Sequence, residues 1–221
     1  MTGSWWVQRI FDEGGFVLLF TWVVWVIGSI VLHELSHGWA AIWEGDDTPR
    51  RLHRMTINPW VHMGPASLIV FAVLGIAWGL MPVDPSRFRH RRWGRLVVAF
   101  AGPAMNIGLA LVALTALALV VRYGPEEGDF ANNLRQFLFV GGWLNLVLAV
   151  FNLLPIPPLD GSTVLGTIFP RLGHFYAQPQ AQMIGMFALM AILISNVDVL
   201  LFHVVTVVAG AYAGALSAVL P

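Results

Sequence analysis

Residues 16–43 read FVLLFTWVVWVIGSIVLHELSHGWAAIW, an apolar run that carries three ionisable side chains close together in its second half. The run is longer than the roughly 20 residues that a helix needs to cross a lipid bilayer. Five further apolar runs follow, the first and fourth of them short: residues 65–81, 96–121, 134–154, 183–195 and 199–220. The pattern predicts an all-α fold, a polytopic helical membrane protein with five or six membrane segments.

The composition also favours a bilayer environment. Of the 221 residues, 57% are hydrophobic and only 11% are charged, whereas about 25% of the residues of a soluble domain are charged. Twelve acidic residues balance 12 arginines, and the chain has no lysine. No net charge attracts nucleic acid, so we expect no DNA or RNA partner. Because the chain has no cysteine, any metal ion must be held by histidine and carboxylate side chains.

The polar connections between the apolar runs are too short to be separate domains. We therefore expect residues 1–221 to form a single membrane domain with no soluble regulatory domain. Residues 1–15 lack the basic start and the small-residue cleavage site of a signal peptide, so we expect the mature chain to begin at Met1.

The most specific motif is HELSH at residues 33–37, which lies inside the first apolar run. On a helix, residues four apart lie on the same face, so His33 and His37 can hold one zinc ion while Glu34 reaches a nearby water molecule. An ionisable side chain near the bilayer centre costs about 2.5–3.5 kcal/mol or more, and a metal ion would offset that cost. The alternative interpretation is that these residues cap a helix or lie among the lipid headgroups.

A catalytic zinc site needs a third protein ligand, and the best candidate is Asp160. It follows an apolar run in the sequence NLLPIPPLDG at residues 152–161. Prolines remove backbone donors and clash with the preceding turn, so a broken helix is expected here. Irregular backbone at membrane depth is tolerated where it lines a cavity or is buried in protein. A plain interfacial turn with a capping Asp160 is the alternative.

These motifs, in this order, resemble the site-two protease family of intramembrane zinc metalloproteases (peptidase M50). The resemblance implies hydrolysis of peptide bonds in or near transmembrane segments of membrane proteins, as in regulated intramembrane proteolysis. It implies one Zn²⁺ held by His33, His37 and Asp160. It further implies that Glu34 is the general base and that Asn152 steadies the oxyanion.

The sequence GPAMN at residues 102–106 resembles a further motif of the same family, so the core motifs extend over residues 33–161. For Asn106 we expect only a helix-packing role, because an amide also bonds well between membrane helices. His62 is assigned no function. The expected partners are a transmembrane protein substrate and the lipid bilayer, and the sequence does not indicate an oligomeric state.

Two arguments predict the topology. The runs carrying His33 and Asp160 must cross the membrane in the same direction to share an ion, so residues 65–81 should be re-entrant or lie along the protein. Nine arginines then fall on one side and three on the other, namely Arg9, Arg122 and Arg135. The positive-inside rule therefore places the active site nearer the cytoplasmic face, in a bacterial or archaeal cell membrane.

Two other functions fit parts of the pattern. A metal-binding membrane transporter would also place histidine and aspartate on broken helices. A catalytically silent adaptor would bind membrane helices without cutting them. For a protease, a helical substrate must unwind, and residues 54–57 are a candidate short membrane-associated strand that could pair with it.

Overall fold

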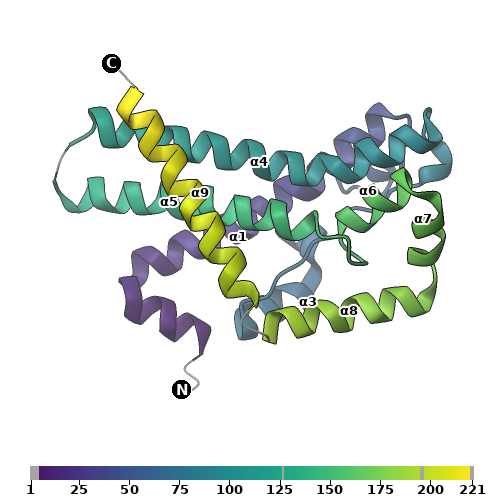
Figure 1. Ribbon diagram of the computed structural model, residues 1–221, viewed down its shortest axis with the longest axis horizontal. Helices are drawn as coiled ribbons and strands as arrows, with labels where there is room; N and C mark the ends of the chain where they lie inside the picture. The colour runs from purple at the N-terminus through teal and green to yellow at the C-terminus, as the bar shows by residue number, and fades with distance from the viewer. Residues whose placement is uncertain (1–4, 126, 195–196, 220–221) are drawn as a thin grey trace.

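The computed structural model describes residues 5–125, 127–194 and 197–219, and no strand occurs in these ranges. The all-α prediction is confirmed (Figure 1). Nine α-helices and one 3₁₀ helix are seen in the described part: α1 Trp6–Trp43, α2 Thr48–Arg51, α3 Pro59–Leu74, η1 Pro85–Arg87, α4 Arg91–Tyr123, α5 Asp129–Asn152, α6 Asp160–Ile168, α7 Pro170–Tyr176, α8 Pro179–Ile194 and α9 Val197–Val219.

Four of these helices are long and apolar enough to cross a membrane: Trp6–Trp43, Arg91–Tyr123, Asp129–Asn152 and Phe202–Val219. Two shorter apolar helices, Pro59–Leu74 and Pro179–Ile192, correspond to the two runs that the sequence marks as short. The prediction of a polytopic helical membrane protein is confirmed, with four full-length segments and two short ones.

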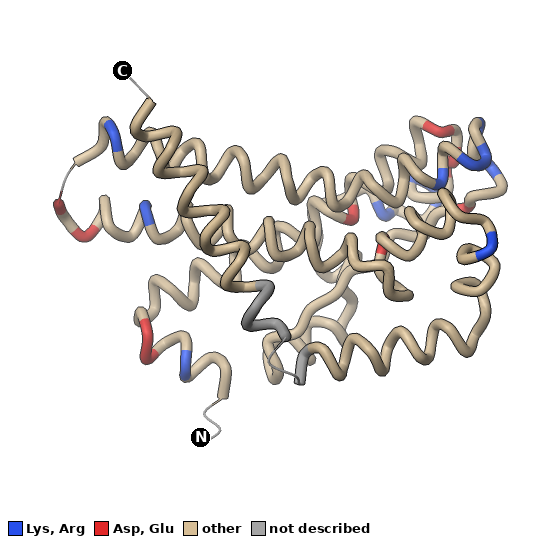
Figure 2. Tube along the Cα trace, viewed as in Figure 1, with Lys and Arg blue, Asp and Glu red and all other residues tan. Residues whose placement is uncertain are grey.

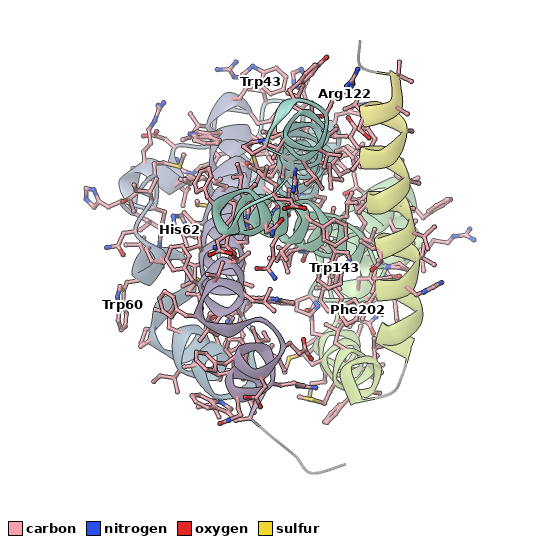
Figure 3. All side chains as sticks on the ribbon, turned by 90° about the vertical axis from the view of Figure 1, so that its left-hand side faces the viewer. Trp43, Trp60, His62, Arg122, Trp143 and Phe202 are labelled. Atoms are coloured by element: carbon pink, nitrogen blue, oxygen red, sulfur yellow. The ribbon has the colours of Figure 1, made fainter. Side chains whose placement is uncertain are left out.

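Helices α4 and α5 run side by side along the long axis of the molecule, and α9 crosses them (Figure 1). The close approach of α5 to α1 and α4 depends on two glycines of α5. A Cβ atom at Gly141 would lie 2.1 Å from the Trp25 ring, and one at Gly142 would lie 2.5 Å from Leu114. Small residues at such contacts let membrane helices pack closely. On the α9 side, Trp143 donates to the Thr206 hydroxyl at 2.8 Å and faces Phe202 (Figure 3).

Helix α1 extends further towards the N-terminus than the sequence predicts, and it is broken at Gly14 and Gly15. Gly15 has φ +64°, a left-handed conformation that glycine adopts without strain. The first turns fold against the end of α3, where the indole N–H of Trp6 donates to the Ala72 carbonyl at 3.1 Å. The apolar pattern could not place this break because glycine is common in membrane helices.

The segment between α1 and α4 leaves the end of α1 and returns to it. The backbone N–H of Arg89 donates to the Glu44 carbonyl at 2.7 Å, and the N–H of Asp84 donates to the Asp46 carboxylate at 2.6 Å. Helix α3 therefore lies on an excursion that starts and ends at one end of the bundle, as the re-entrant prediction requires. Hydrogen bonds from Ser86 hold the pKa of the exposed Asp84 carboxyl below its usual range.

The charged residues gather at the ends of the bundle. Most arginines lie at the end where α1 meets α4, on the right of Figure 2, and the middle is almost free of charge. Exposed tryptophans lie on the outside of the molecule, among them Trp43 and Trp60 (Figure 3). This distribution is typical of a protein whose apolar middle lies in lipid and whose aromatic side chains lie near the headgroups.

Candidate metal centre

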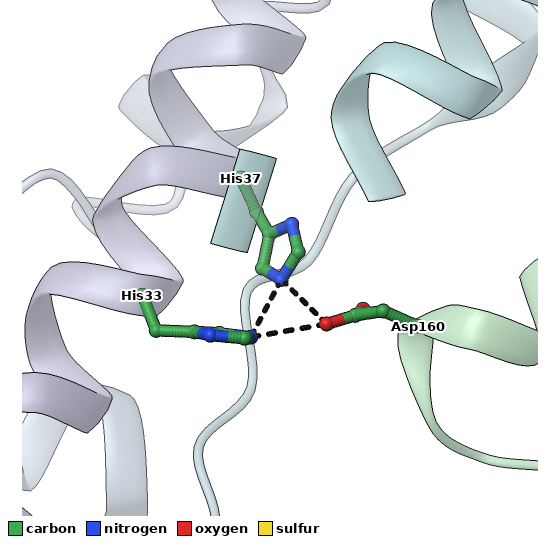
Figure 4. A group of neighbouring side chains, drawn as sticks. All are labelled: His33, His37 and Asp160. Carbon is green, nitrogen blue, oxygen red and sulfur yellow. Dashed lines mark hydrogen bonds and ion pairs between the residues drawn. The ribbon is translucent and has the colours of Figure 1, made fainter. Parts of the chain in front are cut away.

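Three predicted ligands converge beside α1, from two segments far apart in the chain (Figure 4). His33 and His37 lie one turn apart on α1, and Asp160 is the first residue of α6. The His33 Nε2 lies 3.0 Å from the His37 Nε2 and 3.1 Å from the Asp160 Oδ2. The His37 Nε2 lies 3.4 Å from the same carboxylate oxygen. The three ligand atoms therefore surround one position.

The other nitrogen of each imidazole ring is held by an acceptor. The Nδ1 of His33 lies 2.6 Å from the Asn106 Oδ1, and the Nδ1 of His37 lies 2.7 Å from the Val98 carbonyl. A hydrogen on each Nδ1 satisfies these acceptors and leaves the lone pair of each Nε2 directed at the site. Such outer contacts fix the tautomer and orientation of metal-ligating histidines.

The Asn106 contact continues into the bundle. Its amide nitrogen donates to the Asn145 Oδ1 at 2.8 Å, and the Asn145 amide donates to the Gly141 carbonyl at 2.9 Å. Both asparagines are fully buried. The expected packing role of Asn106 was incomplete, because the same side chain also contacts the ring of His33. Asn145 was missed, although an amide within an apolar run was a visible signal.

Space for an ion is provided by Gly102 on α4. A Cβ atom at this position would lie 2.4 Å from the Nε2 of His33 and 2.5 Å from the Nε2 of His37. The absence of that atom leaves the region between the rings and the backbone of α4 open. Two neutral imidazoles and a carboxylate are a donor set that zinc accepts in catalytic sites. The residues present therefore fit a zinc ion.

Glu34 lies beside this centre and is buried, with 7% of its surface exposed. The backbone of the segment after α3 passes over it, because a Cβ at Gly79 would lie 2.6 Å from its Oε1. A cleft of about 900 Å³ opens here, bounded by α1, α4, the α5–α6 connection and residues 77–81. Glu34, the two histidines and the carboxylate all face this cleft.

Asn152 is the last residue of α5 and also lines the cleft. Its amide nitrogen donates to the Leu148 carbonyl at 3.0 Å, so its hydrogen-bonding capacity is partly used within its own helix. The chain then leaves helical geometry until Asp160, as the predicted broken helix requires. Gly161 lets the two ends meet closely, because a Cβ there would lie 2.2 Å from the Leu153 carbonyl oxygen.

The strand expected at residues 54–57 does not form. Instead, Met55 packs its sulfur against Gly38 of α1. The segment that borders the cleft is residues 76–84, which form no regular secondary structure; no strand was predicted there. His62, to which we assigned no function, is buried and bonds the Thr56 carbonyl at 2.6 Å, away from the three ligands.

A model of peptidase family M50 matches residues 21–127 and 121–195 of this chain. The chain belongs to peptidase family M50. The match covers the two histidines, the carboxylate and the glycine that leaves room between them. Membership confirms the family predicted from the motifs, and with it a zinc metalloprotease of the site-two protease type.

Curated proteins similar to this M50 protease come from several bacteria. YwhC of Bacillus subtilis, provisionally named a zinc metalloprotease, is 39% identical over 150 residues, which are 67% of this chain and 68% of YwhC. Rip2 of Mycobacterium tuberculosis, also provisionally named a zinc metalloprotease, is 30% identical over 165 residues, 72% of this chain and 60% of Rip2. No solved structure matches the chain significantly.

Proposed function

We propose that this M50 protease hydrolyses peptide bonds in or near the transmembrane segments of other membrane proteins, with one zinc ion held by His33, His37 and Asp160. The observation that carries the proposal is the position of these three side chains. They meet between helices long enough to span a bilayer, and they face a cleft that also contains Glu34.

The chemistry that zinc supplies when bound is Lewis acidity, which polarises a carbonyl group and makes water a better nucleophile. Glu34 lies beside the metal ligands, so its carboxylate can accept the proton of the attacking water. The same carboxyl group can then protonate the amine that leaves.

Asn152 is the proposed donor to the developing oxyanion. Its amide lines the cleft from the α5 side, whereas Glu34 faces it from α1. An amide donor of this kind contributes about 3–4 kcal/mol to transition-state stabilisation in a comparable protease. Because the amide now donates one hydrogen to Leu148, its second hydrogen remains for a substrate oxygen.

Residues 77–81 are the proposed template for an unwound substrate. Trp78 exchanges both of its backbone hydrogen bonds with the Ser67 hydroxyl, and the Leu80 N–H donates to the His62 carbonyl at 3.0 Å. Alternate residues of an extended chain direct their backbone groups to opposite sides. Since Trp78 and Leu80 bond to α3, we infer that the N–H and C=O of Gly79, which lines the cleft, are directed away from α3, where a substrate segment can pair with them as an added strand.

The proposed membrane orientation places the metal centre nearer the cytoplasmic face. His37 lies six residues before the end of α1, at the end of the bundle where most arginines gather (Figure 2). Arginine-rich connections stay in the cytoplasm of bacterial cells. The substrate would then be cut near the cytoplasmic end of its membrane segment.

The test compares the wild type with Glu34→Gln. Each is co-expressed with a tagged library of single-span membrane proteins, and the fragments are identified by mass spectrometry. We expect fragments that only the wild type produces, because loss of the proton acceptor slows cleavage by about 10²–10⁴-fold. Zinc content should be the same in both proteins. Identical fragment patterns would contradict the proposal and favour a transporter or an adaptor.

A further inference from the structure

A second cavity, of about 670 Å³, lies between the start of α4 and the helices α6 and α7. It is at the arginine-rich end of the molecule, on the right of Figures 1 and 2. Arg91, Arg92 and Arg95 line one wall, and residues of α6 and α7, including His174, line the other. No aspartate or glutamate belongs to the described lining.

The three arginines are not neutralised by the described part of the protein. None of them forms an ion pair with a carboxylate there. Arg91 and Arg95 are one turn apart on the same face of α4, where like charges repel each other. Both also lie at the N-terminus of α4, the positive end of the helix dipole, where a positive side chain is unfavourable. A bound anion would remove both unfavourable terms.

Arg92 is already used for a structural contact. Its Nε donates to the Thr167 carbonyl at 3.1 Å, and a terminal nitrogen donates to the Ile168 carbonyl at 3.0 Å. These carbonyls are at the C-terminal end of α6, so Arg92 ties α6 to α4. Arg91 and Arg95 remain as donors that can point an unengaged guanidinium at the cavity.

Two exposed aromatic residues are next in sequence to residues that line the cavity. Phe169 precedes the lining residue Pro170 and is 54% exposed, and Phe175 of α7, between the lining residues His174 and Tyr176, is 48% exposed. Aromatic side chains with this exposure are common where a membrane protein passes through the headgroup region. The cavity therefore combines cationic donors with exposed aromatic side chains close to its lining residues.

We propose that this cavity binds the phosphate headgroup of an anionic phospholipid, with Arg91 and Arg95 as donors and the acyl chains lying over Phe169 and Phe175. Guanidinium groups bind phosphate through paired, charge-assisted hydrogen bonds. Basic pockets between membrane helices are suited to anionic headgroups. Lipid binding can be measured without the cleavage reaction, and Arg95 also lines the cleft that contains Glu34.

The lipid would also support the metal centre. The cavity is lined by Ser162, Thr163 and Thr167 of α6, and the same short helix carries Asp160 at its first position. A headgroup between α4 and α6 would add to the Arg92 contact and restrict α6 relative to α4. The carboxylate would then be held more firmly against the histidines.

The test uses the full-length protein in nanodiscs of phosphatidylcholine, with or without a minor fraction of phosphatidylglycerol. Native mass spectrometry measures the lipid retained, and thermal unfolding measures stabilisation. We expect the wild type to retain phosphatidylglycerol in preference to phosphatidylcholine and to unfold at a higher temperature with it. Arg91→Gln/Arg95→Gln should bind it about tenfold more weakly or worse, and should lose the stabilisation.

The matched control is Arg50→Gln/Arg51→Gln, which removes the same charge from exposed positions of α2 at the same end of the molecule. This control should still retain phosphatidylglycerol in preference to phosphatidylcholine. If both double variants lose phosphatidylglycerol equally, the lipid is attracted only by general surface charge and the proposed site is wrong. A wild type without preference would overturn it too. Glycerol phosphate in phosphatidylcholine nanodiscs should not stabilise the protein, and equal stabilisation would overturn the lipid assignment. If Arg91→Gln/Arg95→Gln does not fold, Arg91→Gln and Arg95→Gln alone must each weaken retention.

Discussion

His33 and His37 project from the 38-residue helix α1, whereas Asp160 begins the nine-residue helix α6 after a break in the chain. Each histidine is oriented by a buried acceptor from α4, and the acceptor of His33 is itself bonded to α5. Helix α6 is tied to α4 near its far end, by Arg92. The imidazole pair is therefore fixed by the spanning bundle, while the position of the carboxylate depends on a short segment at the end of the bundle.

The largest expected effects come from removing a zinc ligand, either a histidine of α1 or Asp160 of α6. His33→Ala and Asp160→Ala should both lose bound zinc and all measurable cleavage, because two ligands do not retain the ion. His33→Ala should also destabilise the fold by about 1–3 kcal/mol, since it leaves the Asn106 amide oxygen buried and unpaired. Metal analysis and thermal unfolding measure the two effects. His203→Ala, which changes an exposed histidine of α9, is the control and should retain zinc.

The next largest effect on zinc binding should come from filling the space between the His33 and His37 rings. In Gly102→Ala, the added methyl group would stand about where the ion belongs, so zinc binding should fall sharply while the helix remains intact. Gly108→Ala is the matched control on the same helix, because a Cβ at Gly108 meets no atom within 4 Å. Isothermal titration of the zinc-free proteins with zinc would measure the difference. Equal affinities in the two variants would mean that the ion binds elsewhere.

Asn106→Ala tests how the His33 ring is oriented. Loss of the acceptor frees the His33 ring to rotate and to change tautomer, and outer contacts of this kind contribute 10–100-fold, roughly, to metal affinity or activity. The variant should fold, because alanine is favoured in helices. Cleavage rate and zinc affinity should fall together. Asn133→Ala, an exposed change on α5, should leave both unchanged.

The smallest expected effect is that of Asn145→Ala. Asn145 contacts the metal centre only through Asn106, so its loss should reduce activity by less than the loss of Asn106. In the double variant the two effects should not add, because the second change removes a contact that the first has already broken. A double-mutant cycle on cleavage rates measures this coupling. Additive effects would show that Asn145 acts independently of the His33 ring.

The sequence was sufficient for the parts of the site that depend on local spacing. His33 and His37 share a helix face because they are four residues apart, and Asp160 stands out because it follows a proline-rich break. The sequence could not predict the parts of the site that depend on contacts between helices. Residue type alone does not tell which amide meets Asn106, or that Gly102 lies opposite the imidazole rings.

The segment over the cleft shows the same limit. Residues 76–81 belong to the predicted apolar run 65–81, so their sequence resembles the end of a membrane helix. Their conformation is fixed by backbone bonds to Ser67 and His62 of α3, which depend on the return of the chain to α1. The residues chosen as a strand, 54–57, instead pack beneath α1 through Met55.

The most direct test of the shared ion is X-ray absorption at the zinc edge of the purified, zinc-loaded protein. We expect two imidazole nitrogens at about 2.0–2.1 Å and carboxylate or water oxygens at about 2.0–2.2 Å, with one zinc per chain. Asp160→Ala should not retain zinc after purification, so its zinc-edge signal should be lost. A zinc spectrum that is the same in wild type and Asp160→Ala, or a wild type without imidazole ligands, would contradict the shared ion.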